Sequence, residues 1–566
     1  MKPSSDSRSA AVSPAWWKEA AFYQIYPRSF ADSDGDGIGD IPGITGKLDY
    51  LKSLGIDALW LSPIYASPKA DNGYDISDYL ALDPEYGTFA DFDALSAGLR
   101  QRGLRLILDQ VLNHTSDQHP WFIESRSSRA HPKRDWYLWV DAIGFTADGL
   151  PIPPNNWKAA FEGSTWTWDA LTGQFYLNLF SPQQPDLNWK NPEVRTVLYD
   201  VLRTWAARGA DGFRLDVINM IAKAEGYPDA PRPEGNTDAL LPLNCLSCNQ
   251  PPIHDYLREM YREVFAGTDL YAVGETWCMG PENTLDFTSY ESEQLHGAFY
   301  FYFHWAPTGP EQWENFYKLY QVCQGRSWLT VTLGNHDSRR SLSKFGEPVH
   351  HRYASASLLA TWLLTLPATP FLFQGEELGL TDISFDSIED YRDIQTVNRY
   401  HTALAAGNTA EAALASVQED SRDNARTPLP WNDDAGGAGF TTGQPWIPLA
   451  DAHRPQHASG QVADSGSVFH AYAALLALRK RVKSLVYGDL TPLAEPSQVI
   501  AYRRGAWQGH PAVCVVLNWC SESQAWPAAV PMPQAAPLFA NYTAFDSSGL
   551  RPWEALVFYE SSGADG

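Results

Sequence analysis

The sequence predicts an α/β protein: a (β/α)8 TIM barrel with a small domain inserted after its third strand and a C-terminal β-sandwich domain. At 566 residues the chain exceeds the size at which one hydrophobic core stops growing, so smaller domains beside a large one are expected. Short apolar runs alternate with helical patterns, as a parallel barrel requires. Three of these runs are closed by a carboxylate, at Asp216, Glu275 and Asp337.

Eight apolar runs have the length and composition of buried strands. They are bounded by turn residues and separated by segments with helical periodicity. Because the C-terminal ends of all barrel strands meet on one face, acids that are far apart in the sequence can converge there. We predict barrel strands at residues 21–27, 57–63, 104–110, 211–217, 270–275, 299–303, 329–334 and 371–375.

Two segments do not follow this alternation. About a hundred residues separate the third and fourth predicted strands, too many for an ordinary loop, and their middle is rich in tryptophan, proline and asparagine. After Leu485, alternating strands with turn residues replace the helical pattern and predict the β-sandwich. We therefore expect an N-terminal tail at 1–15, the barrel at 16–114 and 190–484, an inserted domain B at 115–189, and a C-terminal domain at 485–566.

No membrane or secretory segment is expected. The longest apolar stretch, 354–373, is interrupted by serine, threonine and proline, which predicts a core helix, a turn at Pro367 and a strand. The first residues lack the apolar core of a signal peptide, and six cysteines are few for this length, so a cytoplasmic location is expected. Cys245 and Cys248 form one CxxC pair, for which a structural or incidental role is favoured over zinc because no second pair accompanies it.

The excess of acidic side chains limits the kinds of molecule that the protein is expected to bind. With 42 basic and 67 acidic side chains, the net charge is -25 at pH 7. This charge repels phosphate backbones and anionic lipids, so we expect no nucleic-acid or membrane partner and a neutral, small substrate. The oligomeric state is left open.

The three strand-end acids match the needs of glycosidic bond cleavage. Cleavage with retention uses one carboxylate to attack the anomeric carbon and a second to protonate the leaving oxygen, and these two lie roughly 5 Å apart. A third acid can bind the sugar hydroxyls as the ring flattens and gains positive charge. The sequence therefore predicts a glycoside-processing enzyme that acts on a small oligosaccharide.

Four segments, namely 109–114 (DQVLNH), 212–216 (GFRLD), 274–276 (GET) and 335–337 (NHD), resemble in order and spacing the signature segments of the α-amylase family of glycoside hydrolases. Longer motifs are similar to the oligo-1,6-glucosidase and dextran glucosidase group: YQIYPRSFADSDGDGIGDIPGI, DNGYDISDY, QPDLNW, FQGEELGLT, IEDYRD and SRDNARTPLPW. The resemblance extends from about Trp16 to the RPWEALVFY segment near the C-terminus. It implies a retaining, exo-acting α-glucosidase.

The resemblance also implies a role for each matching residue. Asp216 resembles the nucleophile, Glu275 the general acid/base and Asp337 the stabiliser of the transition state. Arg214, on the same strand face as Asp216, is expected to keep the nucleophile ionised, with a purely structural ion pair as the alternative. The residues expected to contact the first glucose are Tyr74, Asp75, His114 and His336.

Exo-action and linkage preference depend on further matches. Asp75 and Arg426 are implied to meet in an ion pair that closes the pocket behind one glucose. Val217, directly after the nucleophile, resembles enzymes that cut α-1,6 bonds, although valine is also a common residue of buried strands. Trp277 and Glu389 resemble partners of the second sugar. A methyl group or two in such a pocket is worth only about 1 to 3 kcal/mol, which biases a choice without enforcing it.

Some positions depart from the group. Asn178 replaces the usual histidine, Arg339 replaces the usual proline, and the insertion at 226–252 has no recognisable motif. An α-1,4-glucosidase, a transglucosidase or a sucrose-acting enzyme is therefore the alternative. A non-enzymatic scaffold is disfavoured because this chain keeps the acids that such scaffolds lose.

The acidic loop DSDGDGIGD predicts a calcium site. Four aspartates, Asp32, Asp34, Asp36 and Asp40, alternate with glycines that allow a tight loop, and hard oxygen ligands at this spacing suit calcium. The resemblance adds the Ile38 carbonyl as a ligand. A solvated acidic turn is the alternative; in either case the ion would be structural, and no cofactor is expected for the chemistry.

Overall fold

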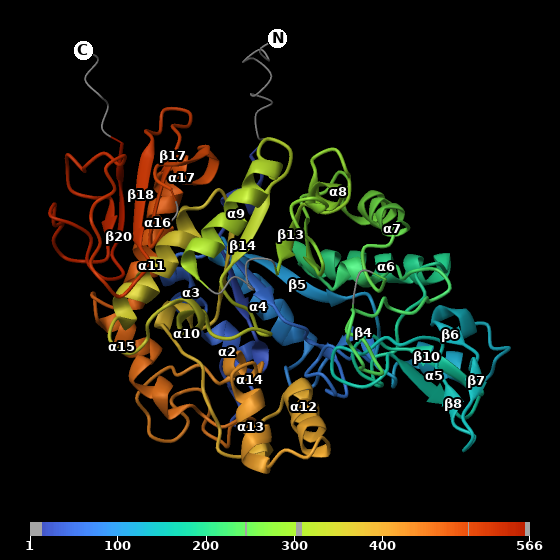
Figure 1. Ribbon diagram of the computed structural model, residues 1–566. Helices are drawn as coiled ribbons and strands as arrows, with labels where there is room; N and C mark the ends of the chain where they lie inside the picture. The colour runs from blue at the N-terminus through green and yellow to red at the C-terminus, as the bar shows by residue number, and fades with distance from the viewer. Residues whose placement is uncertain (1–13, 244–245, 302–307, 496, 561–566) are drawn as a thin grey trace, which may run out of the picture.

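Eight parallel strands form the centre of the protein in the computed structural model, which describes residues 14–243, 246–301, 308–495 and 497–560 (Figure 1). The strands are paired in the order β13, β12, β11, β5, β2, β1, β15, β14, and β13 and β14 at the two ends lie side by side, so the sheet closes on itself as a barrel. The strands are β1 (Phe22–Ile25), β2 (Ala58–Leu61), β5 (Arg105–Val111), β11 (Gly212–Asp216), β12 (Tyr271–Thr276), β13 (Gly297–Tyr300), β14 (Leu329–Thr332) and β15 (Ala368–Phe373).

All eight predicted strands are confirmed. The largest shift is in β15, which begins at Ala368 rather than at residue 371. Pro370, just before the predicted start, pairs in register with Val331 inside the sheet although proline lacks an N–H donor. The predicted strand at 299–303 ends beyond the described residues, and the described part, β13, begins at Gly297.

Helices surround the barrel. They are α2 (Ile41–Gly46), α3 (Leu48–Leu54), α4 (Phe89–Gln101), α6 (Pro192–Arg208), α7 (Ile253–Met260), α8 (Thr284–Thr288), α9 (Gly309–Cys323), α10 (Ser341–Phe345), α11 (Arg352–Thr365) and α16 (Val468–Arg481). The stretch 354–373 forms the buried helix α11, a turn and strand β15, as predicted. Within the described ranges, no helix combines the length and apolarity needed to cross a bilayer.

Aromatic side chains fill the barrel interior beneath the C-terminal strand ends. Phe22 and Phe371 stack with ring centroids 4.4 Å apart, and Trp60 stacks on Phe299 at 5.4 Å. Strand β11 can approach β12 closely because it begins with Gly212, where a Cβ would lie 2.3 Å from the Tyr271 carbonyl oxygen. This packing fixes the height at which β11 presents its last residue, Asp216.

The segment between β5 and α6 folds beside the barrel as a small unit, on the right of Figure 1. It contains α5 (Pro120–Ser127), the antiparallel sheet β6–β10–β9 (Trp139–Val140, Gln174–Leu177, Trp166–Asp169) and the hairpin β7–β8 (Gly144–Phe145, Pro151–Ile152).

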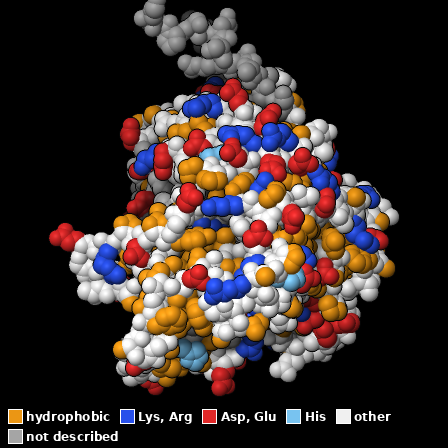
Figure 2. Space-filling model, turned by 90° about the vertical axis from the view of Figure 1, so that its right-hand side faces the viewer, with side chains coloured by type: hydrophobic (Ala, Val, Ile, Leu, Met, Phe, Trp, Pro, Cys, Tyr) orange, Lys and Arg blue, Asp and Glu red, His pale blue; other side chains and the backbone are white. Residues whose placement is uncertain are grey.

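On the face of the molecule shown in Figure 2, basic and acidic side chains are interspersed with hydrophobic ones.

A long segment after β15 returns to the open end of the barrel. It contains α12 (Ile394–Ala405), α13 (Ala410–Gln418) and the short α14 (Asp423–Arg426). Asp393 caps α12 by accepting hydrogen bonds from the amides of Gln395 and Thr396. The same carboxylate also binds Arg422, so the cap of α12 helps to fix this arginine at the site.

The C-terminal domain is antiparallel, as predicted, but its described part contains one sheet rather than the two of a sandwich. The sheet order is β16 (Leu490–Pro492), β17 (Val499–Arg504), β18 (Val513–Asn518), β20 (Ala555–Tyr559) and β19 (Phe539–Ala540). One face contacts α11, and Trp526 and Phe545 cover the other. Several prolines between β18 and β19 lack the N–H donors that a second sheet would need.

Candidate active site

Three barrel strands bring three carboxylates around one guanidinium. Arg214 in β11 lies 2.8 Å from Asp109 in β5 and 2.7 Å from Asp216, and it also contacts Glu275 in β12. All four side chains are buried. Asp109 is held further by the Tyr74 hydroxyl at 2.9 Å and by the Trp60 indole at 3.2 Å. The parallel register of the strands therefore brings two of the three predicted acids, Asp216 and Glu275, to one arginine, and Asp109 joins them there.

Burial and the charge of Arg214 act on Asp216 in opposite directions. Burial, together with the negative charges of Glu275 and Asp109, raises the pKa of Asp216, and Arg214 opposes this effect. Arg214 contacts Asp216 and Glu275 through its two terminal nitrogens, so one guanidinium holds both acids.

Two histidines and a tyrosine lie beside the acids; His114 and Tyr74 line the cavity there, and His336 is buried behind Tyr74. The His336 ring stacks on Tyr74, with centroids 5.1 Å apart and planes 7° from parallel. The Gln24 amide nitrogen lies 2.8 Å from His336 Nδ1 and can only donate, so the ring proton is on Nε2, which faces Asp337 Oδ2 at 3.1 Å. His114 Nε2 lies 3.2 Å from the Tyr74 carbonyl oxygen. Burial lowers the pKa of His114 and of His336 to about 3, so both rings are neutral donors at ordinary pH.

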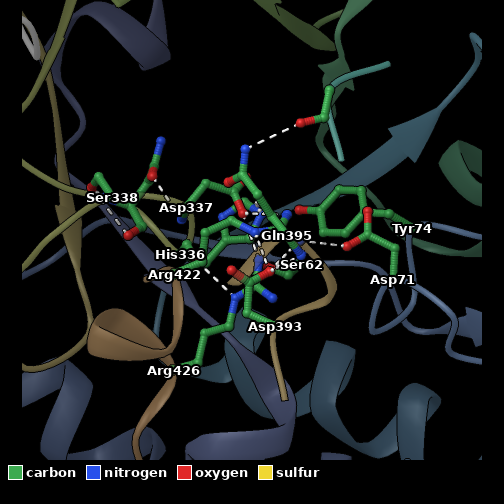
Figure 3. Close-up of polar contacts among 12 residues, drawn as sticks. Ser62, Asp71, Tyr74, His336, Asp337, Ser338, Asp393, Gln395, Arg422 and Arg426 are labelled. Carbon is green, nitrogen blue, oxygen red and sulfur yellow. Dashed lines mark hydrogen bonds and ion pairs between the residues drawn. The ribbon is translucent and has the colours of Figure 1, made fainter. Parts of the chain in front are cut away.

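Asp337 lies where two arginines converge (Figure 3). Its Oδ1 accepts hydrogen bonds from Arg426 at 2.6 Å and from Arg422 at 3.2 Å. Burial would raise the pKa of Asp337, but His336, Arg422 and Arg426 together hold it well below its usual value. This carboxylate therefore stays ionised over the whole working range of pH.

The predicted ion pair between Asp75 and Arg426 is wrong, and a neighbouring pair takes its place. Arg422 Nη2 donates to Asp71 Oδ1 at 2.9 Å, and the same guanidinium binds Asp393 (Figure 3). Asp75 instead accepts hydrogen bonds from the amides of Ala70 and Asp71 and from the Ser67 hydroxyl. It is fully buried and stabilises the loop that carries Asp71. Arg426 faces Asp337 and the His336 carbonyl oxygen.

These residues surround a cavity of about 340 Å³. The volume falls within the range of small-molecule sites, about 300 to 1,000 Å³. The lining residues include the three predicted catalytic acids, and the polar and aromatic side chains around them include Asp71, Tyr74, His114, Phe161, Phe180, Gln184, Trp277 and Arg422. Arg339 lines it too, but its guanidinium already binds Asp382 and Glu419.

Of the residues predicted to bind the second sugar, Val217 and Trp277 line the cavity and Glu389 does not. Glu389 lies in a 3-10 turn (Ile388–Asp390), which Ser387 caps, and its side chain is exposed. Val217 has a left-handed backbone, φ 35°, which is rare for a β-branched residue. In this conformation its amide donates to Glu275 at 3.1 Å. Residue 217 therefore contacts both the cavity and the acid.

The acidic loop brings three of the five predicted calcium ligands together. Carboxylate oxygens of Asp32, Asp34 and Asp40 lie within 4.8 Å of one another, a donor set that suits a hard cation. Asp36 is outside this group, and its carboxylate accepts a hydrogen bond from the Ile38 amide. Burial would raise the pKa of Asp32, but hydrogen bonds from Thr441 and from the loop amides lower it. The loop lies at the start of the chain's first barrel repeat, away from the acid cluster in sequence. Cys245 of the CxxC pair lies outside the described residues.

Several residues that line the site were not predicted. Asp71, Gln184 and Arg422 lie within the quoted motifs DNGYDISDY, QPDLNW and SRDNARTPLPW, and Asp71 and Arg422 are each four residues before the predicted Asp75 and Arg426. Gln184 donates to Asp71 at 3.2 Å and so fixes the second oxygen of this carboxylate. Phe161 packs under the Arg422 guanidinium at 4.6 Å, and no motif signalled it.

Family comparison agrees with the fold and the geometry. A family model described as the catalytic domain of alpha amylase matches residues 24–488, and the chain belongs to this α-amylase family of glycoside hydrolases. It is 42% identical over 563 residues to the oligo-1,6-glucosidase of Parageobacillus thermoglucosidasius, covering 96% of this chain and 98% of that relative. It is 39% identical to the trehalose-6-phosphate hydrolase of Escherichia coli (strain K12), covering 96% and 98%. Among solved structures, the trehalulose synthase MutB from Pseudomonas mesoacidophila MX-45 has a TM-score of 0.89 at 39% identity, covering 97% of this chain and 100% of that one.

Proposed function

We propose that this protein is a retaining, exo-acting α-glucosidase that releases glucose from the non-reducing end of short oligosaccharides, with α-1,6 linkages preferred. The observation that carries the proposal is the buried Asp71–Arg422 ion pair beside the acids Asp216, Glu275 and Asp337. It lines a cavity whose volume of about 340 Å³ suits one or two sugar rings.

In the proposed mechanism, Asp216 attacks the anomeric carbon and Glu275 protonates the leaving oxygen. The resulting glucosyl ester on Asp216 is then hydrolysed by water, which Glu275 deprotonates. One guanidinium, that of Arg214, contacts both acids, which favours the carboxyl separation of a retaining enzyme, about 5 to 5.5 Å, over the about 6.5 to 9.5 Å of an inverting one. The positive charge of Arg214 also favours the ionised form of the nucleophile.

The proposed exo-action follows from how the cavity is closed. Arg422 is anchored by Asp393 and Asp71, and Asp71 is anchored in turn by Gln184. Their remaining hydrogen-bonding capacity can hold the terminal hydroxyls of one glucose, with Asp337 beside them. Because this network of buried ion pairs is held at several points, a longer chain cannot pass beyond the first sugar.

Linkage preference is supported by relatives and by the leaving-group side of the cavity. Three relatives at 40 to 42% identity are named oligo-1,6-glucosidases. Arg339 is neutralised by Asp382 and Glu419, which favours a neutral leaving group over a phosphorylated one. The second candidate function is a sucrose-acting transglucosidase, which the similarity to the trehalulose synthase favours.

The test is a comparison of specificity constants for isomaltose, maltose, sucrose and trehalose 6-phosphate with one enzyme preparation. We expect isomaltose to exceed each of the others by about tenfold or more, and glucose to be the first product from isomaltotriose. A higher value for maltose or trehalose 6-phosphate would overturn the linkage claim. Conversion of sucrose mainly to isomeric disaccharides would instead support the second candidate.

We also propose a structural calcium ion in the acidic loop, held by Asp32, Asp34 and Asp40, with Asp36 and the Ile38 carbonyl as the further expected ligands. The donor set of clustered carboxylates supports it. A cytoplasmic location is proposed as well. It is consistent with the buried thiols of Cys323 and Cys514, whose pKa values burial raises to about 12 and about 11, so that both stay protonated and inert.

A further inference from the structure

Arg426, one of the two arginines that hold Asp337, lies in the four-residue helix α14 (Figure 3). Its Nη2 donates to Asp337 Oδ1 at 2.6 Å, and its Nε donates to the His336 carbonyl oxygen at 2.9 Å. Its third nitrogen, Nη1, is buried without a hydrogen-bond partner among the described residues. A single helical turn has little stability of its own. Other elements must therefore fix the backbone from which this guanidinium reaches the acid.

Side chains from outside α14 hold its last three carbonyl groups. Arg340, at the start of α10, donates to the carbonyl oxygens of Asn424 and Ala425 at 3.1 and 2.8 Å. Ser29 ends a 3-10 turn directly after β1 and is fully buried, and its hydroxyl donates to the carbonyl oxygen of Arg426. Ser29 therefore binds the backbone of the residue that carries the guanidinium.

The chain after α14 cannot supply these hydrogen bonds. In a longer helix, the amides of residues 428–430 would bind the last carbonyls of α14, but Pro428 and Pro430 have no N–H. The remaining amide, that of Leu429, donates instead to the Ser29 carbonyl oxygen at 2.9 Å. Ser29 therefore holds the chain on both sides of Pro428, once through its hydroxyl and once through its carbonyl.

Trp446 sets the direction of the Ser29 hydroxyl. The Trp446 indole N–H lies 3.0 Å from the hydroxyl oxygen and can only donate, so the hydroxyl proton is available for the Arg426 carbonyl. Hydrogen bonds in such a chain polarise one another. Trp446 is itself fixed, because its amide donates to the Gly37 carbonyl oxygen at 3.0 Å and the Arg28 guanidinium lies over its ring at 4.8 Å. The chain of hydrogen bonds thus extends from the acidic loop to α14.

We propose that Ser29 and Trp446 are positioning residues that hold Arg426 against Asp337 and so keep this acid oriented for the transition state. Neither residue lines the catalytic cavity in the described structure, so both act through Arg426. The inference rests on the proposed glucosidase function. In glycoside hydrolysis, hydrogen bonds to the sugar hydroxyls strengthen in the transition state, so a misoriented Asp337 lowers kcat more than it raises KM.

The test is a double-mutant cycle with Ser29→Ala, Trp446→Phe and the double variant, assayed by glucose release from isomaltose. Ser29→Ala removes the hydrogen bond to Arg426, and we expect kcat to fall about 3- to 10-fold while KM changes by less than about twofold. Trp446→Phe removes only the indole donor, so a loss of about two- to threefold is expected. In the Ser29→Ala background, Trp446→Phe should cost almost nothing more, because its hydroxyl partner is already absent.

Ser484→Ala is the matched control. Ser484 is also fully buried, and its hydroxyl also binds backbone carbonyls, those of His510 and Pro511 in the C-terminal domain. This variant should lower the melting temperature by an amount similar to that of Ser29→Ala but leave kcat within about 1.5-fold of the wild type. The comparison separates the positioning of Arg426 from a general loss of stability.

Three results contradict the proposal. An unchanged kcat in folded Ser29→Ala shows that Arg426 does not need the hydroxyl, and an equal loss of kcat in Ser484→Ala assigns the effect to stability. Additive losses in the double variant show that Trp446 does not act through Ser29. If Ser29→Ala does not fold, Trp446→Phe decides, since an unchanged kcat there rejects the proposal and a lower kcat with unchanged KM supports it.

Crystal structures keep this test separate from the test of the proposed function. They compare the wild type with Ser29→Ala or, if that variant does not fold, with Trp446→Phe, and they measure the distance from Arg426 Nη2 to Asp337 Oδ1. A wild type that releases no glucose from any α-glucoside would reject the proposed function. In that case, a guanidinium that has moved away from Asp337 in the variant still supports the positioning role, and an unmoved guanidinium rejects it.

Discussion

Replacing Asp71 by asparagine tests the closed end of the cavity. The Asp71 carboxylate is buried and accepts hydrogen bonds from Arg422 at 2.9 Å and Gln184 at 3.2 Å. A hydrogen bond to a charged group contributes about 1.5 to 3 kcal/mol and a neutral one about 0.5 to 1.5. The neutral amide should therefore cost about 1 to 2 kcal/mol in transition-state binding, which corresponds to about 5- to 30-fold in kcat/KM. The fold should survive because Arg422 retains Asp393 and Asp337 as partners.

The assay is glucose release from isomaltose at low substrate concentration, with the melting temperature measured in parallel. Asp75→Asn is the matched control, since Asp75 is four residues away and binds only its own loop in the described structure. We expect this control to lower the melting temperature while kcat/KM of the folded enzyme changes by less than about threefold. The reasoning is refuted if Asp71→Asn retains full kcat/KM, or if Asp75→Asn is the variant that loses it.

Three further predictions concern specificity, pH and metal. Val217→Thr should shift the ratio of specificity constants for isomaltose and maltose toward maltose by about tenfold, and an unchanged ratio would remove Val217 from the account. Burial raises the pKa of Glu376 from 4.5 to about 8 in the folded protein. As pH rises between these two values, Glu376 is ionised in the unfolded chain but still protonated in the folded one, so the free energy of unfolding falls. The melting temperature of Glu376→Gln should therefore rise relative to wild type between about pH 5 and 8, whereas that of the exposed Glu389→Gln should not. Removing calcium with a chelator should lower the melting temperature of the wild type but not of Asp34→Ala, and equal shifts in both would argue against the loop site.

The barrel could be predicted from sequence because its strands are buried on both faces. Such strands appear as short runs rich in apolar residues, for example 104–110 and 211–217, and their spacing leaves room for the helices between them. The architecture of the C-terminal domain was harder to predict, because the apolar and polar residues of its strands follow the same pattern whether a second sheet or a helix covers the sheet. Here α11 from the barrel provides that cover, and no local pattern near residue 500 reveals it.

At the site, residue type was predicted more reliably than position. The motif DNGYD contains two aspartates, and SRDNAR contains two arginines, so either member of each pair fits the chemistry. The backbone decides between them. Left-handed conformations at Asn72 and Gly73 turn the loop so that Asp71 faces Arg422 while Asp75 turns back to cap the loop amides. Such turns depend on tertiary contacts, which the sequence pattern does not contain.

The most direct measurement is mass spectrometry of the enzyme after reaction with a fluorinated α-glucosyl fluoride, which forms the glucosyl-enzyme faster than water can release it. The account predicts one glucosyl adduct, on the peptide that contains Asp216, and no adduct in Asp216→Asn. An adduct on another carboxylate, or rapid turnover by Asp216→Asn, would contradict the assignment of the nucleophile and the mechanism built on it.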